Sequence, residues 1–582
     1  MSNRLKNFSA AILLLAAGFA VNANALQNGF LWDDQTQVVK NIIIRSWENL
    51  PAIFASSTFY NGGASLSGSF YRPLVSFSYL LNYSVWGLNP FGFRLFQIFF
   101  HLINIVLIFF LLKKIFSEEG IGYGDQAAFL AALIFAVHPA NAESVIYIGC
   151  IGEIFYAFFI LLAALIFLNG IDRNNRSVKN INLILAFLLV FLGLLSKETA
   201  IVILPILFIY LLLFTRSKLS VYARFFLGCG AVGGVYWFLR FFVAKLPAMK
   251  FHLAPIALAP LWQRLSTIPY EIVSYLGIIF FPRDLSISRQ FVVVSAFDPR
   301  FWLASLFLGA SFTAVVFYSV KTKSKVVPFF LLWFAVALAP ALNIIPLDMT
   351  MAERWLYVPV IGILAIAGLF SAYLINGFSL AHKKFFCAII AILLAALGAR
   401  TIVRNADWKD GLTLFGHDYK IVSRMSPQGS FDLENNYGVE LLRIGQTDEA
   451  ERHLTKSVAL QPRWASSQNN LGVVLERQGD LEGALAHYGQ SIKSGTRYQA
   501  YENKSSLLVK LGRYDEAKSF LLRSLSKFPQ NNNLKLYLAQ AYIADNTKES
   551  RQKALVLIAK ILDSDPENFS ARQLYQTIQN NR

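Results

Sequence analysis

Two adjacent carboxylates, Asp33 and Asp34, come directly after the first apolar segment of the chain. They lie near the start of a polar stretch that precedes many further apolar segments. An acid pair at a boundary between water and membrane suggests chemistry on a substrate that is carried by a lipid. A solvated loop without a role is the alternative, and residues further along the chain bear on the choice.

Four further groups of charged residues lie inside or beside apolar segments, where charge is costly and needs a reason. The groups are Tyr71-Arg72-Pro73-Leu74, His138-Pro139 with Glu143, Ser196-Lys197-Glu198-Thr199, and Glu353-Arg354-Trp355-Leu356-Tyr357-Val358-Pro359. Any one of them alone is more typical of a helix-end anchor or a salt bridge. In the topology that we favour below, all four face the same side as Asp33, which predicts one shared site.

The elements that must position these residues are membrane helices. The chain has 582 residues, of which 55% are hydrophobic, well outside the usual range of soluble proteins. The formal charge of +18 does not indicate nucleic-acid binding, because much of the excess lysine and arginine lies in short loops such as Lys113-Lys114. Positive charge in short loops marks the cytoplasmic side. Apolar runs that could span a membrane, or nearly so, occur at 8–26, 93–115, 126–140, 148–169, 180–196, 198–214, 222–243, 263–282, 301–320, 326–345, 354–376 and 384–403.

The loop charges conflict with twelve crossings. Basic residues at 216–224 and at 321–325 both indicate cytoplasmic loops, yet three candidate spans lie between them. One segment within 222–320 is then interfacial or re-entrant, or the C-terminal domain is cytoplasmic. We favour about eleven crossings and an external C-terminus. We also favour a retained first span over cleavage after Ala23-Asn24-Ala25. Whether the first span is retained or cleaved, the acid pair lies in an external loop at 27–92.

The chain changes character after a membrane domain at 1–404 and a connector at 405–428. In 429–582, alanines recur at 450, 484 and 517, each inside a similar helix-start pattern, and Ala554 follows at a similar spacing. Spacings of 34, 33 and 37 residues predict tetratricopeptide (TPR) helix pairs. Asn436, Asn470 and Asn503 each lie fourteen residues before one of these alanines. We expect this column to bind the backbone of an extended peptide, unless the asparagines serve local structure only.

The order of these motifs resembles a known family. An acid pair in the first external loop, then YRPL, HPxxxE, SKE and ERxLYxP, followed by the repeats, is similar to the transmembrane-and-TPR O-mannosyltransferases. These belong to the GT-C class of integral-membrane glycosyltransferases. The resemblance runs from about residue 28 to the final repeat and implies an all-α fold, with about 11–12 spans followed by a soluble TPR superhelix. One departure is visible: the family usually has a Gly-Arg pair after Glu143, where this chain has Gly149-Cys150.

The resemblance also implies a chemistry. Such enzymes move a sugar from a polyprenyl phosphate to an acceptor hydroxyl, and the attacking hydroxyl needs a carboxylate base. Asp33 or Asp34 fits that role, and the other could orient the acceptor or help to hold a divalent ion. The leaving phosphate calls for fixed cations, for which Arg354 ranks first, then Arg72, with Lys197 and His138 as further candidates. The supporting residues are Glu143, Glu198 and Glu353, which could pair with these cations, and Tyr357 of the last motif.

The sequence thus predicts an integral-membrane inverting hexosyltransferase that modifies a protein Ser or Thr on the non-cytoplasmic side. No zinc-type spacing and no glycine-rich nucleotide loop occurs, which favours a lipid-linked donor over a nucleotide sugar. The expected partners are the bilayer, the polyprenyl-phosphate sugar and an acceptor protein held by the repeats, but no nucleic acid. A bacterial inner membrane with an external, periplasmic repeat domain suits the N-terminus. Transfer to a glycolipid or envelope polysaccharide, and an inactive membrane-anchored TPR scaffold, are the alternatives.

Overall fold

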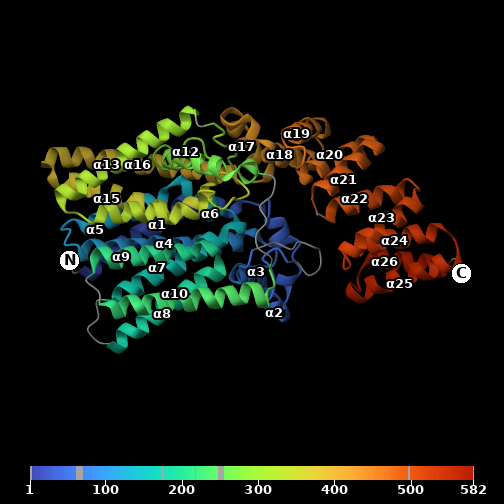
Figure 1. Cartoon of the computed structure of the whole chain (residues 1–582), viewed down its shortest axis with the longest axis horizontal. Coiled ribbons are helices and arrows are strands. Elements are labelled where there is room, and N and C mark those ends of the chain that lie inside the picture. The colour runs from blue at the N-terminus through green and yellow to red at the C-terminus, as the bar shows by residue number, and fades with distance from the viewer. Residues whose placement is uncertain are drawn as a thin grey trace. The chain divides into compact units, whose positions relative to one another are not determined.

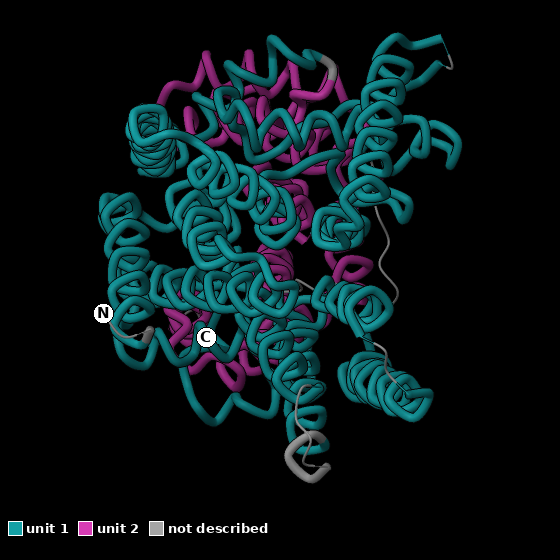
Figure 2. Tube along the Cα trace, turned by 90° about the vertical axis from the view of Figure 1, so that its left-hand side faces the viewer, with its two compact units in different colours: residues 1–59, 68–427 teal, residues 60–67, 428–582 magenta. Residues whose placement is uncertain are grey.

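The computed structural model describes residues 3–60, 70–171, 176–215, 218–246, 254–295, 297–495 and 498–580. Part of the predicted external loop, residues 61–69, and part of the predicted basic loop, residues 216–217, lie outside these ranges. The chain forms two compact units, one of residues 1–59 and 68–427 and one that contains residues 428–582 (Figure 2). The fold class is all-α, as predicted. Within the described residues, the β-structure is a single isolated bridge between Arg289 and Met351.

The first unit is built from helices, because a chain in lipid must satisfy its backbone hydrogen bonds within each segment. Its α-helices are α1 (Asn3–Asn22), α2 (Leu50–Phe54), α3 (Pro73–Trp86), α4 (Pro90–Glu118), α5 (Gly124–Val137), α6 (Ala142–Ile146), α7 (Ile151–Ile171), α8 (Arg176–Ser196), α9 (Ile203–Phe214), α10 (Leu219–Phe238), α11 (Pro255–Leu258), α12 (Leu261–Phe280), α13 (Pro299–Thr322), α14 (Val326–Leu338), α15 (Val360–Gly377), α16 (Leu380–Asp407) and α17 (Gly411–Met425). Helix α4 packs against α1, α5 and α7, so it lies inside the bundle (Figure 1).

Seven helices in the described part of the chain are long and apolar enough to cross a membrane, and the chain is an integral membrane protein. They are Arg4–Gln27, Pro90–Glu118, Ile148–Ile171, Leu219–Val243, Pro299–Thr322, Val360–Gly377 and Leu380–Asp407. Three predicted runs form shorter apolar helices, Asn180–Ser196, Glu198–Phe214 and Val326–Ala341. Helix α12, from the predicted run 263–282, is not in either set, which favours it as the segment of 222–320 that does not cross.

A sharp bend interrupts the third predicted run. Helix α5 ends at Val137, and the chain turns by 56° into the short helical segment Pro139–Ile146. Proline has no backbone N–H and clashes with the preceding turn, so a helix usually ends before it. The bend places Glu143 and Tyr147 at the end of the bundle instead of along a lipid-facing helix.

The second unit consists of antiparallel helix pairs, as the repeat spacing predicts. They are α18 (Phe431–Arg443), α19 (Thr447–Leu460), α20 (Ala465–Gln478), α21 (Leu481–Ser494), α22 (Tyr498–Lys510), α23 (Tyr514–Lys527), α24 (Asn532–Ala544) and α25 (Lys548–Ser564), followed by α26 (Phe569–Asn580). The repeat alanines Ala450, Ala484, Ala517 and Ala554 are fully buried. Gly472 explains why the repeats need a small residue, because a Cβ there would lie 2.7 Å from the ring of Tyr488.

Candidate functional site

The acid pair lies on a tight turn that its own backbone and a distant loop hold in place. Asp34 is fully buried, and its carboxylate accepts the N–H of Leu31 at 3.0 Å and the N–H of Gly149 at 2.8 Å. Burial raises the pKa of Asp34 to about 7, although these two N–H groups and nearby Arg94 favour the charged form. Asp33 is partly exposed. The two carboxylates therefore differ, because Asp34 is buried and fixes the turn whereas Asp33 keeps partial exposure.

A buried arginine supports the same turn from below. Arg94, in the first turn of α4, is fully buried and donates to the carbonyl oxygens of Asn28 and Gly29 and, at 3.2 Å, of Ile146. Arg94 thereby links residues 28–29, just before the acid pair, with the bent segment that follows α5. Our sequence analysis missed this residue. The available signal was an arginine at the start of a long apolar run, where a charge needs a partner.

Aromatic rings close the turn on its other side. Trp32 stacks on Tyr147 with ring centroids 5.5 Å apart, and Tyr147 stacks in turn on Trp408 at 5.6 Å. The Tyr147 hydroxyl also accepts the backbone N–H of Asp33 at 3.3 Å. Trp32 has a φ of +48°, a conformation that is unusual for a large side chain and that the stack compensates.

The HPxxxE and ERxLYxP motifs meet in one ion pair. The Arg354 guanidinium lies 2.5 Å from a Glu143 carboxylate oxygen, and the Arg354 backbone N–H donates to the other oxygen at 2.8 Å. Glu143 is completely buried, whereas the Arg354 side chain keeps 15% of its exposure. The prediction that Glu143 pairs with one of the cations is therefore seen in the geometry, and Arg354 is held in one orientation.

The two other predicted cations are also paired. Arg72 lies 2.9 Å from Glu198, which Arg240 contacts from the opposite side at 3.4 Å. Lys197 is buried and pairs with Glu153. The sequence motifs do not include Glu153 and Arg240, because each lies in an apolar run outside them.

Two of the predicted residues lie in the protein interior with their polar atoms engaged. The His138 ring accepts the N–H of Ala140 at 3.1 Å and donates to the carbonyl of Ile279 at 2.8 Å, which makes it a helix-end residue. The Tyr357 hydroxyl, also buried, lies 2.8 Å from His101. The structure thus gives both residues a structural task.

Glu353 belongs to a separate buried network. It lies 3.6 Å from Arg404, and both side chains are fully buried. Arg404 makes a closer pair with Asp418 at 2.8 Å, and Asp418 also accepts the backbone N–H of Ile287 at 2.8 Å. The partner of Glu353 is therefore an arginine on α16, outside the set of cations that the motifs contain.

The segment 147–153 connects these groups. The Tyr147 phenol interacts electrostatically with Asp33, Asp34 and Arg354. The Cys150 thiol, three residues on, interacts with Arg354, Glu143, Glu153 and Lys197. By direct contact, the acid pair meets this segment at Tyr147 and Gly149, and Lys197 meets it at Glu153. A single shared site stays a prediction. Among the described residues, no group of three His, Cys, Asp or Glu side chains is arranged to hold a metal ion.

Comparisons with known proteins identify the same two parts. Residues 72–240 match the family described as dolichyl-phosphate-mannose-protein mannosyltransferase, and residues 438–496 and 498–531 match the tetratricopeptide repeat. The protein O-mannosyl-transferase F38B6.6 of Caenorhabditis elegans is 26% identical over 78% of this chain and 63% of its own length. The mouse protein O-mannosyl-transferase TMTC3 is 24% identical over 78% of this chain and 51% of its own, and human TMTC1 is 25% identical over 79% and 56%.

The chain matches the transmembrane-and-TPR O-mannosyltransferase family. The resemblance that the motif order predicted is confirmed. The chain spans about half to two thirds of the length of these curated relatives. All three are from animals, so a bacterial inner membrane and a periplasmic repeat domain stay predictions.

Cys150 lies in the segment where the resemblance to O-mannosyltransferases implies a Gly-Arg pair. It is buried, and the two carboxylates nearest to it, Glu143 and Glu153, already have cations in Arg354 and Lys197. The loop therefore balances its charge without a basic residue at this position. The neighbouring Gly149 supplies the N–H that Asp34 accepts.

The predicted asparagine column of the repeat domain forms a ladder of amides. Asn470 donates to Asn435 at 2.9 Å, and Asn503 donates to Asn469 at 3.0 Å, so each bond crosses from one repeat to the next. Within the first repeat, Asn435 donates to Asn436 at 3.0 Å. The sequence missed Asn435 and Asn469, which lie one residue before the predicted column. The ladder gives the column a structural role besides any role in binding.

Proposed function

We propose that this protein transfers mannose or a related hexose from a polyprenyl phosphate to a Ser or Thr hydroxyl of an acceptor protein, by the GT-C type of chemistry. The family match supports sugar transfer to protein, and the observation that carries the mechanism is the contrast within the acid pair. One carboxylate is locked by two backbone N–H groups, and its neighbour keeps partial exposure.

Asp33 is the base in this mechanism. The acceptor oxygen attacks the anomeric carbon and gives its proton to the Asp33 carboxylate, while the bond from that carbon to the phosphate oxygen breaks. The products are an O-glycoside of inverted configuration and a free polyprenyl phosphate. Asp34 cannot take this role in the same geometry, because it is fully buried and both its oxygens already accept hydrogen bonds. Its task is to hold the turn on which Asp33 is carried.

Arg354 and Arg72 are the residues that we propose for the leaving phosphate. Both side chains keep partial exposure, and an arginine can share its donors between a carboxylate and a phosphate. Pairing with Glu143 and Glu198 fixes the two guanidinium groups before substrate arrives, so no reorganisation is needed as negative charge develops. Lys197, buried against Glu153, contributes positive potential instead of direct contact.

We assign the site to the non-cytoplasmic side, with the repeat domain on that side as the acceptor-binding part. The positive loops support this orientation, because Lys113 and Lys114 lie at the opposite end of α4 from Arg94. A divalent ion stays a prediction: turnover that survives chelation by EDTA would exclude it, and turnover restored by added Mg²⁺ or Mn²⁺ would support it.

The test is donor turnover in membranes that contain wild type, Asp33→Asn, Asp34→Asn or the control Asp125→Asn. Asp125 pairs with Lys113 at the other end of the bundle. A panel of radiolabelled polyprenyl-phosphate sugars is followed into the protein and lipid fractions. We expect label in protein for one sugar, and a loss of about 10²-fold or more for Asp33→Asn at unchanged expression. Label in the lipid fraction, or wild-type turnover in Asp33→Asn, would refute the proposal.

A further inference from the structure

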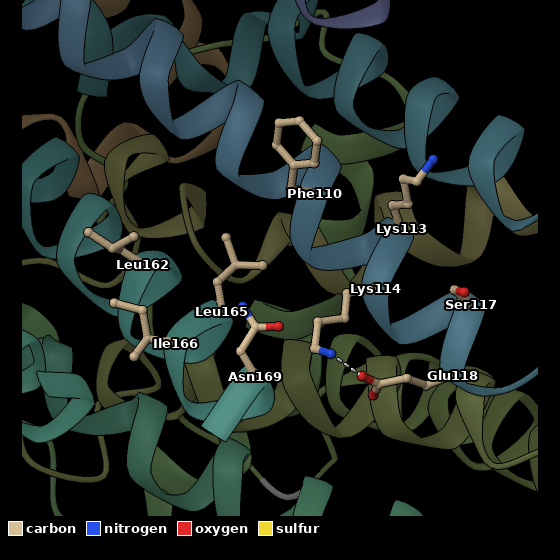
Figure 3. A pocket seen from close by; sticks show the side chains of 9 residues that line it. All are labelled: Phe110, Lys113, Lys114, Ser117, Glu118, Leu162, Leu165, Ile166 and Asn169. Atoms are coloured by element: carbon tan, nitrogen blue, oxygen red, sulfur yellow. Dashed lines mark ion pairs between the residues drawn. The ribbon is translucent and has the colours of Figure 1, made fainter. Parts of the chain in front are cut away.

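One groove of the first unit lies toward the C-terminal end of α4, away from Arg94 and the acid pair. It has a volume of about 570 Å³ and runs between the C-terminal parts of α4 and α7 (Figure 3). Both helices are candidate membrane spans and both belong to the first unit. The proposed transfer reaction uses none of the side chains that line it.

The wall of the groove is apolar and its end is charged. Phe110, Leu162, Leu165 and Ile166 form the apolar part, and each is partly exposed. At the end of the helices, the lining changes to Lys113, Lys114, Ser117, Glu118 and Asn169. An apolar groove that leads to polar groups at the end of a membrane helix has the polarity gradient of a lipid with its headgroup.

The charges that face the groove are balanced. Lys114 pairs with Glu118, one turn further along α4, and Figure 3 shows this pair beside Asn169. Lys113 is engaged elsewhere, because its ammonium donates to Asn7 on α1 at 2.8 Å and pairs with Asp125 on α5. One cation and one anion are therefore presented together. The Tyr210 hydroxyl on α9 donates to Glu118, which fixes the position of the carboxylate.

We propose that this groove binds an aminophospholipid, with its phosphate on Lys114 and its ammonium on Glu118. The acyl chain would lie along Phe110, Leu162 and Leu165, and Ser117 and Asn169 line the same groove and offer further polar groups. An i,i+4 ion pair at a surface contributes little by itself, so its exchange for two pairs with a zwitterionic headgroup costs little.

Charge complementarity selects this headgroup. A phosphatidylglycerol has no cation for Glu118, and its negative charge would be repelled by that carboxylate. A phosphatidylcholine has a cation without N–H donors, so it cannot hydrogen-bond to Glu118. Phosphatidylethanolamine offers both the phosphate and an ammonium with three donors. The site is therefore distinct from any polyprenyl-phosphate site, where a single negative charge must be held.

The experiment uses the full chain, purified in mild detergent and washed free of endogenous lipid. Phosphatidylethanolamine, phosphatidylcholine and phosphatidylglycerol of the same acyl chains are added separately, and bound lipid is counted by native mass spectrometry beside the thermal midpoint. We expect phosphatidylethanolamine to bind and to raise the midpoint most. Lys114→Met and Glu118→Gln should each weaken its binding about tenfold, as loss of a charge-assisted hydrogen bond does.

Two further variants separate the groove from general lipid contact. Leu165→Trp fills the apolar part without changing charge and should also abolish binding, whereas Lys384→Met, on the exposed part of α16, should behave as wild type. Equal binding of the three lipids, or wild-type binding by both Lys114→Met and Glu118→Gln, would overturn the proposal. Binding of phosphatidylglycerol that depends on Lys114 alone would overturn it too, because the site would then be one for anionic lipid.

Discussion

The buried carboxyl of Glu353 tests the electrostatics of the protein interior, because the sign of its effect on stability at each pH can be worked out. Burial raises the pKa of Glu353 from an ordinary 4.5 to about 7; Arg404 lowers it, and the carboxylates of Glu143 and Asp418 raise it further. Among the described residues, neither Glu353 oxygen accepts a hydrogen bond. Asp418 already pairs with Arg404 at 2.8 Å. A neutral side chain at position 353 is therefore favoured in the folded protein.

The magnitude follows from linkage. A carboxyl with a raised folded pKa holds more protons in the folded than in the unfolded chain, so the free energy of unfolding falls as the pH rises from about 4.5 to 7. At about 1.4 kcal/mol for each pKa unit, ionised Glu353 costs about 3 kcal/mol at pH 8 and under about 1 kcal/mol at pH 5. Glu353→Gln has the shape of the neutral acid and removes this cost. We therefore expect the variant to be more stable than wild type, by more at pH 8 than at pH 5.

The assay is thermal unfolding of the full chain in detergent at pH 5 and pH 8, with the folded fraction read by size-exclusion chromatography. The matched control is Glu48→Gln, which removes an exposed carboxylate and should shift neither midpoint. If Glu353→Gln instead lowers the midpoint equally at both pH values, the 3.6 Å contact with Arg404 stabilises the ionised form. The reasoning from burial would then be refuted.

Three other perturbations test the turn and the ladder. The amide side chain of Asp34→Asn can accept only one of the two backbone N–H groups well, so this variant should lose about 1–3 kcal/mol of stability as well as turnover. Asp33→Asn should lose turnover alone. Thermal midpoints and sugar transfer, measured on both variants, distinguish them. Arg94→Met leaves two buried carbonyl groups and one partly buried carbonyl group without their donor and should cost about 3 kcal/mol or more, measured as a fall in the thermal midpoint. Asn469→Ala breaks the amide ladder and should cost about 1 kcal/mol, seen as faster proteolysis within 428–582.

The fold class and the repeat domain were predictable because their signals are periodic and local. Long apolar runs must form helices in lipid, and the recurring alanines mark where helix pairs pack. The number of crossings was harder, since it depends on how a segment such as α12 packs. That helix carries polar side chains, including the fully buried Glu271, that only the tertiary structure accommodates.

The roles of the candidate site residues stay predictions, and only part of their pairing could be foreseen from the sequence. Glu143 and Glu198 have the arginine partners that the motifs suggest, at Arg354 and Arg72. Lys197 pairs with Glu153, and Glu353 pairs with Arg404. Both partners, Glu153 and Arg404, lie outside the motifs. Which acid meets which base depends on how bent segments such as that after α5 bring helix ends together, and no spacing rule in one sequence contains that information.

The departure at Cys150 leads to a last prediction, because the structure explains why the chain tolerates it. The thiol is buried among two carboxylates and two cations that already form pairs, Glu143 with Arg354 and Glu153 with Lys197. An arginine here would bring a third cation to two committed carboxylates and would need space that the packed loop lacks. Cys150→Arg, which restores the family pattern, should therefore lower the thermal midpoint and should not raise sugar transfer, whereas Cys150→Ser should keep both. Higher transfer by Cys150→Arg would contradict this account: the Glu153–Lys197 pair would then be a consequence of a missing arginine, and the site an impaired form of the family's catalytic centre.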